Sequence, residues 1–424
     1  MERIVKLLAE AGIEDYSVSF EKERTAELFF VKKQLDMRRI KDVEKYNAVV
    51  YRTEEKDGEK FRAATNATLL PSMTDEEIKE ALTGAYFAAQ FAMNPYYELP
   101  DPVKAPAILK RGELAEADPE ESAGKMAAAL FAADNADGAF VNSAEVFIVK
   151  KSIRVVTSRG ADVSWTEAKA EGEYVVQAKE PEDVEMYKRF GFDELETEAL
   201  TEQVSEALTF VRDRARAERI LKSGNYDLIL TGENVGQVLS FYCMRSAAQL
   251  IFPGYSTWKT GDDVQGEAAG EKVNITMRAT APYSAEGIPM KDVKLIENGV
   301  MMTSHGSNRF CRYLGVKPTG DYKKFSCDNA GTVSFEEMKK TPCLWAVTFS
   351  DFQMDFFSGH FGGEIRLAYL IDGDNIIPVT GGSVNGSMIE AQSDIAFSTD
   401  RFTSDSYEGP YAIKLKGVAV AGIE

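Results

Sequence analysis

The feature that most constrains this chain is a change of pattern at residue 224, where a strand-rich half follows a mixed half. After one helical segment at 236–250, nearly every apolar run is short and bounded by turn residues. Glycine is dense between 359 and 386, and glycine permits bulges and tight corners in bent strands. The second half is therefore predicted to be antiparallel sheet that is strongly bent or closed into a barrel. The pair Asn298-Gly299 adds a hairpin signal.

The first half alternates helical and strand-like segments. Thr74 and Glu77 have the spacing of a capping box at a helix start, and Asp118 before Pro119 is typical of another. A long helix is predicted from about Asp193 to Ser223. Strand-like runs precede the first of these helices, at 15–20, 25–31, 34–40 and 45–52, and four more lie between 140 and 180.

The predicted fold class is α+β, an N-terminal α/β region of strands and helices followed by the β-rich domain. The proline-containing stretch 94–106 is interpreted as a linker. The predicted units are an α+β module at 1–106, a second at 107–223 and the β-rich C-terminal domain at 224–424.

The charge balance excludes some partners. The net charge of the 424 residues is −19, and a surface of that sign repels nucleic acid and anionic lipid. No apolar run approaches the eighteen residues or more of a membrane span, and the acidic start is unlike a signal peptide. The four cysteines, at 243, 311, 327 and 343, form no C-x-x-C pair. We therefore expect a cytoplasmic protein that binds neither nucleic acid nor membrane.

Recognisable catalytic motifs are missing from the sequence. A catalytic zinc needs about three side-chain ligands, and protease helices usually supply two histidines beside a glutamate. Only His305 and His360 occur, 55 positions apart and outside any H-E-x-x-H context. No G-x-S-x-G elbow is present either. His360, with Ser358 in the run SGHFGG, is a candidate at a cleft rim; a hydrogen-bonded histidine on a bent strand is the favoured interpretation.

The helical segment behind the apolar run LILTGEN raises the main functional question. A helix that follows a strand and a polar turn often faces a cleft, yet this one offers Ser240, Tyr242, Cys243 and Arg245. It carries neither histidine nor carboxylate between 236 and 252. It is either a catalytic helix that lost its reactive groups or part of the core.

Longer motifs carry a resemblance to a known family. The segment 283–320 contains Glu286-Gly287, Ile296-Glu297-Asn298-Gly299 and Thr319-Gly320. GTVSFEEM follows, and then FFSGHFGGEIRLAYLIDGDNIIPVTGGSVNGSMIEA. In order and spacing these runs resemble the TldD/PmbA family, and the resemblance extends over most of the chain, including the N-P-Y-Y-E-L-P segment.

The resemblance implies an N-terminal α/β region, a β-rich C-terminal domain and subunits that pair around a peptide-accepting cavity. Active members of the TldD type hold zinc with H-E-x-x-x-H on the first helix of the C-terminal domain and a cysteine near the C-terminus. Ser240, Phe241 and Arg245 align with the motif here, and the tail KLKGVAVAGIE has no cysteine. Phe241 cannot act as a base, and the positive charge of Arg245 would repel zinc. The chain thus resembles the PmbA (TldE) branch, which lacks the metal ligands.

The leading hypothesis is a non-catalytic, peptide-binding subunit that encloses unfolded peptide with a TldD-type zinc protease. This chain then has no catalytic residue and no cofactor of its own, and zinc belongs to the partner. One alternative is a homodimeric, metal-independent hydrolase that uses His360, Ser358 and Arg245. A further alternative is a peptide binder without a catalytic partner. The family's historical label as a modulator of DNA gyrase gains little support, because the acidic charge argues against direct DNA contact.

Overall fold

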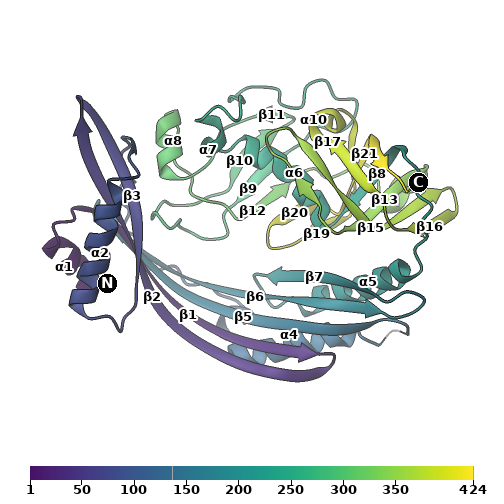
Figure 1. The fold of residues 1–424 in the computed structure, drawn as a ribbon, viewed down its shortest axis with the longest axis horizontal. Coiled ribbons are helices and arrows are strands. Elements are labelled where there is room, and N and C mark those ends of the chain that lie inside the picture. Colours follow the sequence, from purple (N-terminus) through teal and green to yellow (C-terminus); the bar gives the residue numbers. More distant parts are fainter. Residues whose placement is uncertain (136, 424) are drawn as a thin grey trace.

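A computed structural model describes residues 1–135 and 137–423. Its two main parts lie one above the other, with a long, curved N-terminal sheet below and the C-terminal domain above (Figure 1). The small helices near the N-terminus lie beyond one end of the sheet, and the C-terminus lies at the opposite end of the molecule.

The N-terminal sheet has seven strands in the order β4-β3-β2-β1-β5-β6-β7. β1 pairs with both β2 and β5, so one continuous sheet joins the strands of residues 1–106 to those of 107–223. The strands are β1 (Asp15–Val31), β2 (Gln34–Lys56), β3 (Glu59–Leu69), β4 (Asn94–Pro95), β5 (Phe140–Thr157), β6 (Asp162–Ala178) and β7 (Val184–Phe192).

These strands are longer than the sequence pattern predicts. The runs 15–20 and 25–31 were expected to be separate, but both belong to β1. The charged residues between them stay in the strand because neighbouring strands supply opposite charges. Lys22 lies 2.8 Å from Glu44 of β2, and Glu23 lies 2.8 Å from Lys151 of β5. Cross-strand pairs of this kind stabilise a sheet surface that an apolar pattern does not reveal.

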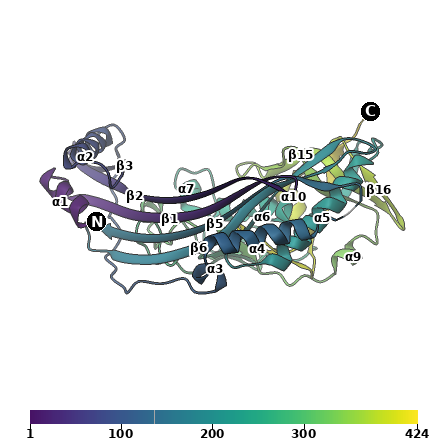
Figure 2. The same ribbon diagram turned by 90° about the horizontal axis from the view of Figure 1, so that it is seen from below.

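Helices cover the ends and the lower face of the sheet (Figure 2). They are α1 (Glu2–Glu10), α2 (Asp75–Ala89), α3 (Glu113–Glu116), α4 (Pro119–Ala132) and α5 (Thr197–Ala215). The capping box of Thr74 and Glu77 is confirmed, and the Asp118 side chain caps α4. The prediction of a helix over 193–223 was too long. α5 ends at Ala215, and the backbone N–H of Glu218 donates to the carbonyl of Pro378 at 2.8 Å instead of to the helix.

The C-terminal domain contains the predicted barrel. Five strands close a ring, since β13 pairs with β8, β8 with β21, β21 with β17, β17 with β15, and β15 again with β13. The strands are β8 (Gly224–Thr231), β13 (Cys343–Phe349), β15 (His360–Asp372), β17 (Ser383–Ser387) and β21 (Ala412–Ala421); β14 (Gln353–Met354), β16 (Asn375–Val379) and β18 (Ile395–Phe397) extend it.

A six-stranded sheet lies beside the barrel, in the order β11-β10-β9-β12-β20-β19. The predicted hairpin at Asn298-Gly299 is confirmed, with φ of 51° and 77° in the left-handed region that this turn requires. The strands are β9 (Ile275–Arg278), β10 (Val293–Glu297), β11 (Val300–Met301), β12 (Lys324–Cys327), β19 (Arg401–Thr403) and β20 (Tyr407–Pro410). The helical segments of the domain are α6 (Glu233–Arg245), α7 (Ala248–Ile251), α8 (Asn308–Leu314), α9 (Phe335–Met338), α10 (Met388–Ala391) and a 3₁₀ turn at Gln392–Asp394.

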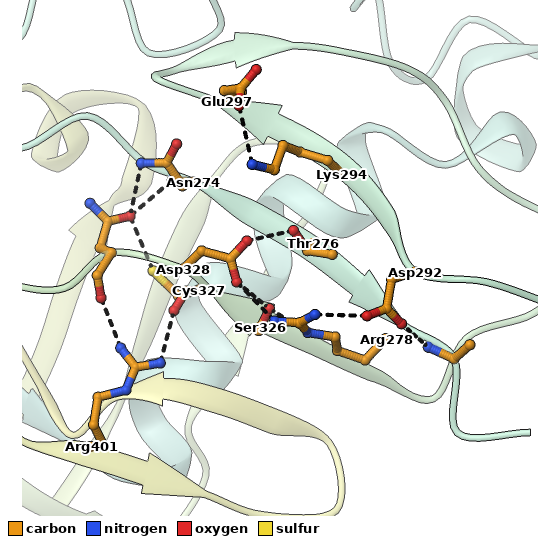
Figure 3. A network of polar contacts seen from close by, with 12 residues as sticks. Asn274, Thr276, Arg278, Asp292, Lys294, Glu297, Ser326, Cys327, Asp328 and Arg401 are labelled. Carbon is orange, nitrogen blue, oxygen red and sulfur yellow. Dashed lines mark hydrogen bonds and ion pairs between the residues drawn. The ribbon is translucent and has the colours of Figure 1, made fainter.

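A polar network fixes β9 against β12 on one face of this sheet (Figure 3). Thr276 donates to Asp328 at 2.6 Å, and Arg278 donates to Ser326 at 2.9 Å and Asp292 at 2.7 Å. Because side chains alternate along a strand, Met277 projects from the opposite face. The network thus orients the strand that forms one wall of the cavity described below.

One hydrophobic core connects the two parts of the molecule. It contains residues of α4, α5 and the long sheet together with Tyr369, Ile371 and Ala412 of the barrel. A second core fills the C-terminal domain around α6. None of the helices in residues 1–135 and 137–423 has both the length and the apolar character needed to cross a bilayer.

Candidate functional site

Helix α6 is the element around which the candidate site is built. Gly232 joins it to β8 with φ of 58° and donates its N–H to Tyr411 O at 2.8 Å, so the strand turns sharply into the helix. The predicted helix over 236–250 is interrupted. Ala247 is extended, because the N–H of Ala248 turns to the carbonyl of His305 at 2.8 Å, and α7 begins afterwards.

One face of α6 forms the wall of a cavity of about 620 Å³. Met277 and Phe325 of the six-stranded sheet lie opposite, and His305, Asp321 and Tyr322 complete the wall. The residues that α6 contributes follow helical spacing: Glu233, Gly236, Gln237, Ser240, Cys243 and Met244. The expectation that this helix faces a cleft therefore agrees with its position.

Ser240 and Phe241 occupy opposite surroundings although they are neighbours. Ser240 lines the cavity and donates its hydroxyl to the carbonyl of Gln237 at 2.6 Å. Phe241 is 1% exposed, and its ring lies 5.6 Å from that of Trp258, edge to face. Phe241 is therefore a core residue, and Ser240 is the only one of the two that a ligand in the cavity can reach.

Arg245 lies at the C-terminal end of α6, beside a cluster of aromatic residues. Its Nη1 donates to the carbonyl of Tyr255 at 3.0 Å and to that of Phe357 at 3.4 Å, and the guanidinium lies 5.4 Å from the Trp258 ring centre. Burial lowers the pKa of Arg245, but a guanidinium starts so high that it stays charged. Its Nε is buried and has no hydrogen-bond partner among the described residues.

Ser358 lies on the loop that leads into β15, directly after the Phe357 carbonyl that Arg245 contacts, and His360 is the first residue of the strand. The Ser358 hydroxyl donates to Asp355 at 2.5 Å, and the backbone N–H of His360 donates to Ser358 Oγ at 3.3 Å. The imidazole turns elsewhere, with Nδ1 3.3 Å from the carbonyl of Gly386. Arg245 of α6 thus contacts the loop that carries Ser358. The His360 ring contacts the carbonyl of Gly386 on β17 rather than the serine.

His305 is a cavity residue that sequence reasoning did not select. Its Nε2 lies 2.9 Å from the carbonyl of Cys243 on α6, so Nε2 carries the proton and Nδ1 keeps its lone pair. Burial lowers the pKa of His305, which favours the neutral ring. The contact is made across 62 residues of sequence, and the one signal available was that the chain has only two histidines.

Two carboxyl groups also line this cavity, and both residues stay accessible to solvent. The surrounding protein partly desolvates Asp321 and Glu233, which lies at the first turn of α6, and this raises the pKa of both. The cavity therefore offers a neutral imidazole and two carboxyl groups whose pKa is raised.

A second cavity, of about 720 Å³, adjoins the first between the long sheet and the C-terminal domain. Glu233, Gln237 and Ser406 border both cavities. Residues 187–191 of β7 line one wall. The rest of the lining mixes charged side chains, Glu171, Glu173, Glu206 and Asp405, with aromatic ones from both parts of the molecule: Phe147, Tyr174, Phe210, Phe349, Phe352, Phe402 and Tyr411. The first cavity extends along α6 from Glu233 to Met244, and the second meets it at the N-terminal turn of the helix.

The side chains at the three positions that the resemblance aligns with the zinc motif do not fit a zinc ion. Phe241 has no donor atom, Arg245 is cationic, and the Ser240 hydroxyl is bonded to its own helix. Within residues 1–135 and 137–423, His, Cys, Asp and Glu side chains form no group of three that could hold a metal. All four cysteines are free thiols buried in the C-terminal domain.

Comparisons with known proteins agree with this architecture. Residues 223–422 match the family model of the PmbA/TldA metallopeptidase C-terminal domain. Among curated proteins, none matches the chain at a significant level. The chain is similar to TldE from Thermococcus kodakarensis, with a TM-score of 0.79 and 17% identity over 99% of this chain and 100% of that one.

Two further solved structures have the same fold. A proposed modulator of a DNA gyrase from Thermotoga maritima MSB8 gives a TM-score of 0.76 with 17% identity, over 99% of each chain. A proposed modulator of DNA gyrase from Bacteroides thetaiotaomicron VPI-5482 gives 0.77 with 14% identity, over 100% of this chain and 98% of that one. Residues 223–422 thus form a C-terminal domain of the TldD/PmbA family, and the whole chain shares the fold of these solved structures.

Proposed function

We propose that this chain is a non-catalytic, peptide-binding subunit that partners a zinc-bearing TldD-type peptidase. The observation that carries the proposal is that α6 lines a cavity of about 620 Å³ with Ser240, while Phe241 and Arg245 stand at the other two positions of the family's metal motif. The chain has a cavity beside α6, but the side chains at these positions cannot hold zinc. The fold shared with a TldE agrees with this assignment.

The cavities suit an extended peptide. β7 is the edge strand of the seven-stranded sheet, and its residues 187–191 line the cavity of about 720 Å³. An extended peptide can pair with the free backbone groups of such an edge, while its side chains enter the adjoining pockets. Unfolded segments supply such a strand more readily than folded ones, which fits a role in enclosing unfolded peptide.

The charge of Arg245 explains why this subunit needs a partner. A guanidinium beside the loop of Phe357 occupies the place where the family's second histidine would approach zinc, and like charges repel strongly in a partly buried site. Peptide hydrolysis then requires a second chain that supplies H-E-x-x-x-H and the metal. In that assembly the present chain contributes part of the enclosing wall.

The test is reconstitution with a chain from the same genome that carries H-E-x-x-x-H. We expect the two proteins to form a stable complex at micromolar concentration, measured by light scattering. Cleavage of an unfolded peptide should require both chains and stop on chelation. Absence of a complex at that concentration would contradict the partner role.

A matched pair of variants tests the peptide-binding part. Ser240→Trp fills the cavity and should weaken peptide binding at least tenfold, measured by fluorescence anisotropy, without weakening the complex. Ser205→Trp places the same ring on the exposed side of α5 and should bind peptide as the wild type does. Equal affinities of the two variants would show that the α6 cavity is not where peptide binds.

The same assays distinguish the alternatives. Peptide hydrolysis by the chain alone that survives chelation and is lost in His360→Ala would indicate the homodimeric hydrolase. Peptide binding without cleavage, either alone or with the relative, would indicate a binder that has no catalytic partner.

A further inference from the structure

β2 has a long free edge in the N-terminal sheet. β3 pairs with β2 only from Tyr46 onward, so among the described residues 34–45 pair on one side only, with β1. The backbone groups on the other side are open along about 40 Å, at ~3.4 Å per residue. β2 forms the lower border of the sheet, away from the C-terminal domain (Figure 1).

This edge carries exposed apolar side chains on both faces. Leu35 is 46% exposed, Met37 43%, and Ile40 and Val43 44% each. Folded proteins usually protect a long free edge with charges, because an open strand invites pairing with another chain. Charges are present here, but they are occupied within the chain. Arg38 pairs with Glu120, and Arg39 and Lys41 both pair with Glu27.

The side chains of this edge are close to neutral as a set. Residues 34–45 contain four basic and three acidic side chains, a net charge of +1 in a chain whose total is −19. Two copies of so acidic a chain repel each other over most of their surface. Two copies that approach through this nearly neutral edge meet less electrostatic repulsion there.

We propose that β2 pairs antiparallel with β2 of a second copy of this chain, with Ile40 opposite Ile40 on a twofold axis. In this register residue i faces residue 80 − i of the other copy. Met37 then meets Val43, and Arg38 meets Asp42, each twice because the contact is symmetric. The Arg39–Lys41 contacts are balanced by the two Glu27 carboxylates.

Other registers of the β2–β2 pair place apolar side chains opposite charged ones. A shift of two residues in one direction sets Ile40 against Asp42, and a shift in the other direction sets it against Arg38. A shift of one residue moves every side chain to the wrong face of the strand. The remaining like-charged contact, Asp36 with Glu44, lies where Asp36 bulges out of register with β1 and Glu44 bonds Lys22 at 2.8 Å.

The result is one sheet that continues through both copies, with α4 on the same face in each. The pairing uses a border remote from α6, so it is compatible with a partner bound at the cavity side and does not depend on the proposed peptide function. The purified chain alone is sufficient to test it. We expect a sedimentation mass of twice the chain's 46.9 kDa at concentrations of tens of micromolar, and cross-linking at this edge distinguishes the β2 contact from a dimer formed at the cavity side.

Cysteine cross-linking tests the register. Ile40→Cys places two thiols opposite each other at the axis, where directly facing Cβ atoms lie about 4.5–5.5 Å apart. Val43→Cys is the matched control, because Val43 has the same exposure of 44% but its two copies lie about 20 Å apart. Mild oxidation should give covalent dimer with Ile40→Cys and none with Val43→Cys, while the native cysteines stay buried.

Charge reversal provides a second measurement. Asp42→Arg sets two arginines against each other and should raise the dissociation constant at least tenfold. Arg38→Asp combined with Asp42→Arg restores opposite charges at both contacts and should recover most of the affinity, less what the lost Arg38–Glu120 pair costs. A wild-type mass of 46.9 kDa, or equal cross-linking of the two cysteine variants, would overturn the proposal.

Discussion

At the scale of single residues, His305 shows how the fold gives a side chain a role that its sequence neighbours do not reveal. The ring is fixed by one bond, from Nε2 to the carbonyl of Cys243 at 2.9 Å, where α6 approaches its end. That bond sets the tautomer and leaves Nδ1 to accept a hydrogen bond from a ligand in the cavity. The backbone N–H of a peptide is a donor of the required kind.

The buried imidazole makes stability depend on pH. Burial lowers the pKa of His305 in the folded chain. As pH falls through the ordinary value of about 6.5, the unfolded chain therefore binds a proton at this histidine while the folded chain stays unprotonated there. Stability is then lost on acidification, by at most about 1.4 kcal/mol at pH 5.5. His305→Gln keeps a donor for Cys243 but removes the titration. Urea denaturation between pH 7.5 and 5.5 should show a smaller loss for the variant than for the wild type.

Other titrating groups are common to both proteins, so the difference between the two curves isolates His305. Parallel curves would show that the histidine takes up its proton equally in the folded and unfolded states.

The sequence located the candidate helix but not the residues that surround it. Ser240, Phe241 and Arg245 were selected because the family resemblance aligns them with the zinc motif of TldD-type members. His305 and Asp321 reach the same cavity through loops, and nothing in their local sequence specifies where those loops lead. His360 was selected for its glycine-rich surroundings, and its ring bonds Gly386 of the next strand.

At the scale of elements, glycine patterns predicted the barrel better than apolar patterns predicted strand length. Dense glycine at 359–386 indicated a closed or bent sheet, and the strands there do close a ring. The long strands β1 and β2 were underestimated, because the charged residues at their centres are paired across the sheet with residues far away in sequence. Periodicity alone cannot detect partners of this kind.

One of these glycines has a steric role that can be measured. A Cβ added to Gly386 of β17 would lie 2.2 Å from the ring of Phe361 on β15. Gly386→Ala must therefore displace a buried aromatic side chain and should reduce the free energy of unfolding by about 1–3 kcal/mol. Gly84→Ala is the matched control, because Gly84 lies in α2 with open space around its Cβ position. Alanine there should raise stability by about 0.5–1 kcal/mol.

Denaturant titration of the two variants measures both effects. Opposite signs are expected for the same chemical change, and a loss of equal size at both positions would contradict the steric role of Gly386.

At the scale of the whole molecule, the two parts are connected by a shared core and by polar contacts at opposite ends. Near one end, Tyr411 of the barrel donates to Glu206 of α5 at 2.7 Å. Near the other, Asn308 of α8 donates its amide to the carbonyl of Glu98 at 2.7 Å, and Tyr313 donates to Pro95 at 2.6 Å. These contacts hold the N-terminal sheet in place beside the cavities.

The contact made by Asn308 is the one most open to test, because this residue is completely buried and bonds a segment that the sequence indicated only as a linker. Asn308→Ala leaves the Glu98 carbonyl without its donor, at a cost of about 1–3 kcal/mol. We expect faster hydrogen exchange and faster proteolysis across residues 94–106, since that segment is then held less firmly against α8. Asn385→Ala removes an exposed amide that bonds only Ser383 of its own strand, and it should leave both rates unchanged. If the two variants exchange alike across 94–106, the linker is fixed by the sheet on its other side, and the position of the long sheet relative to the cavities does not depend on α8.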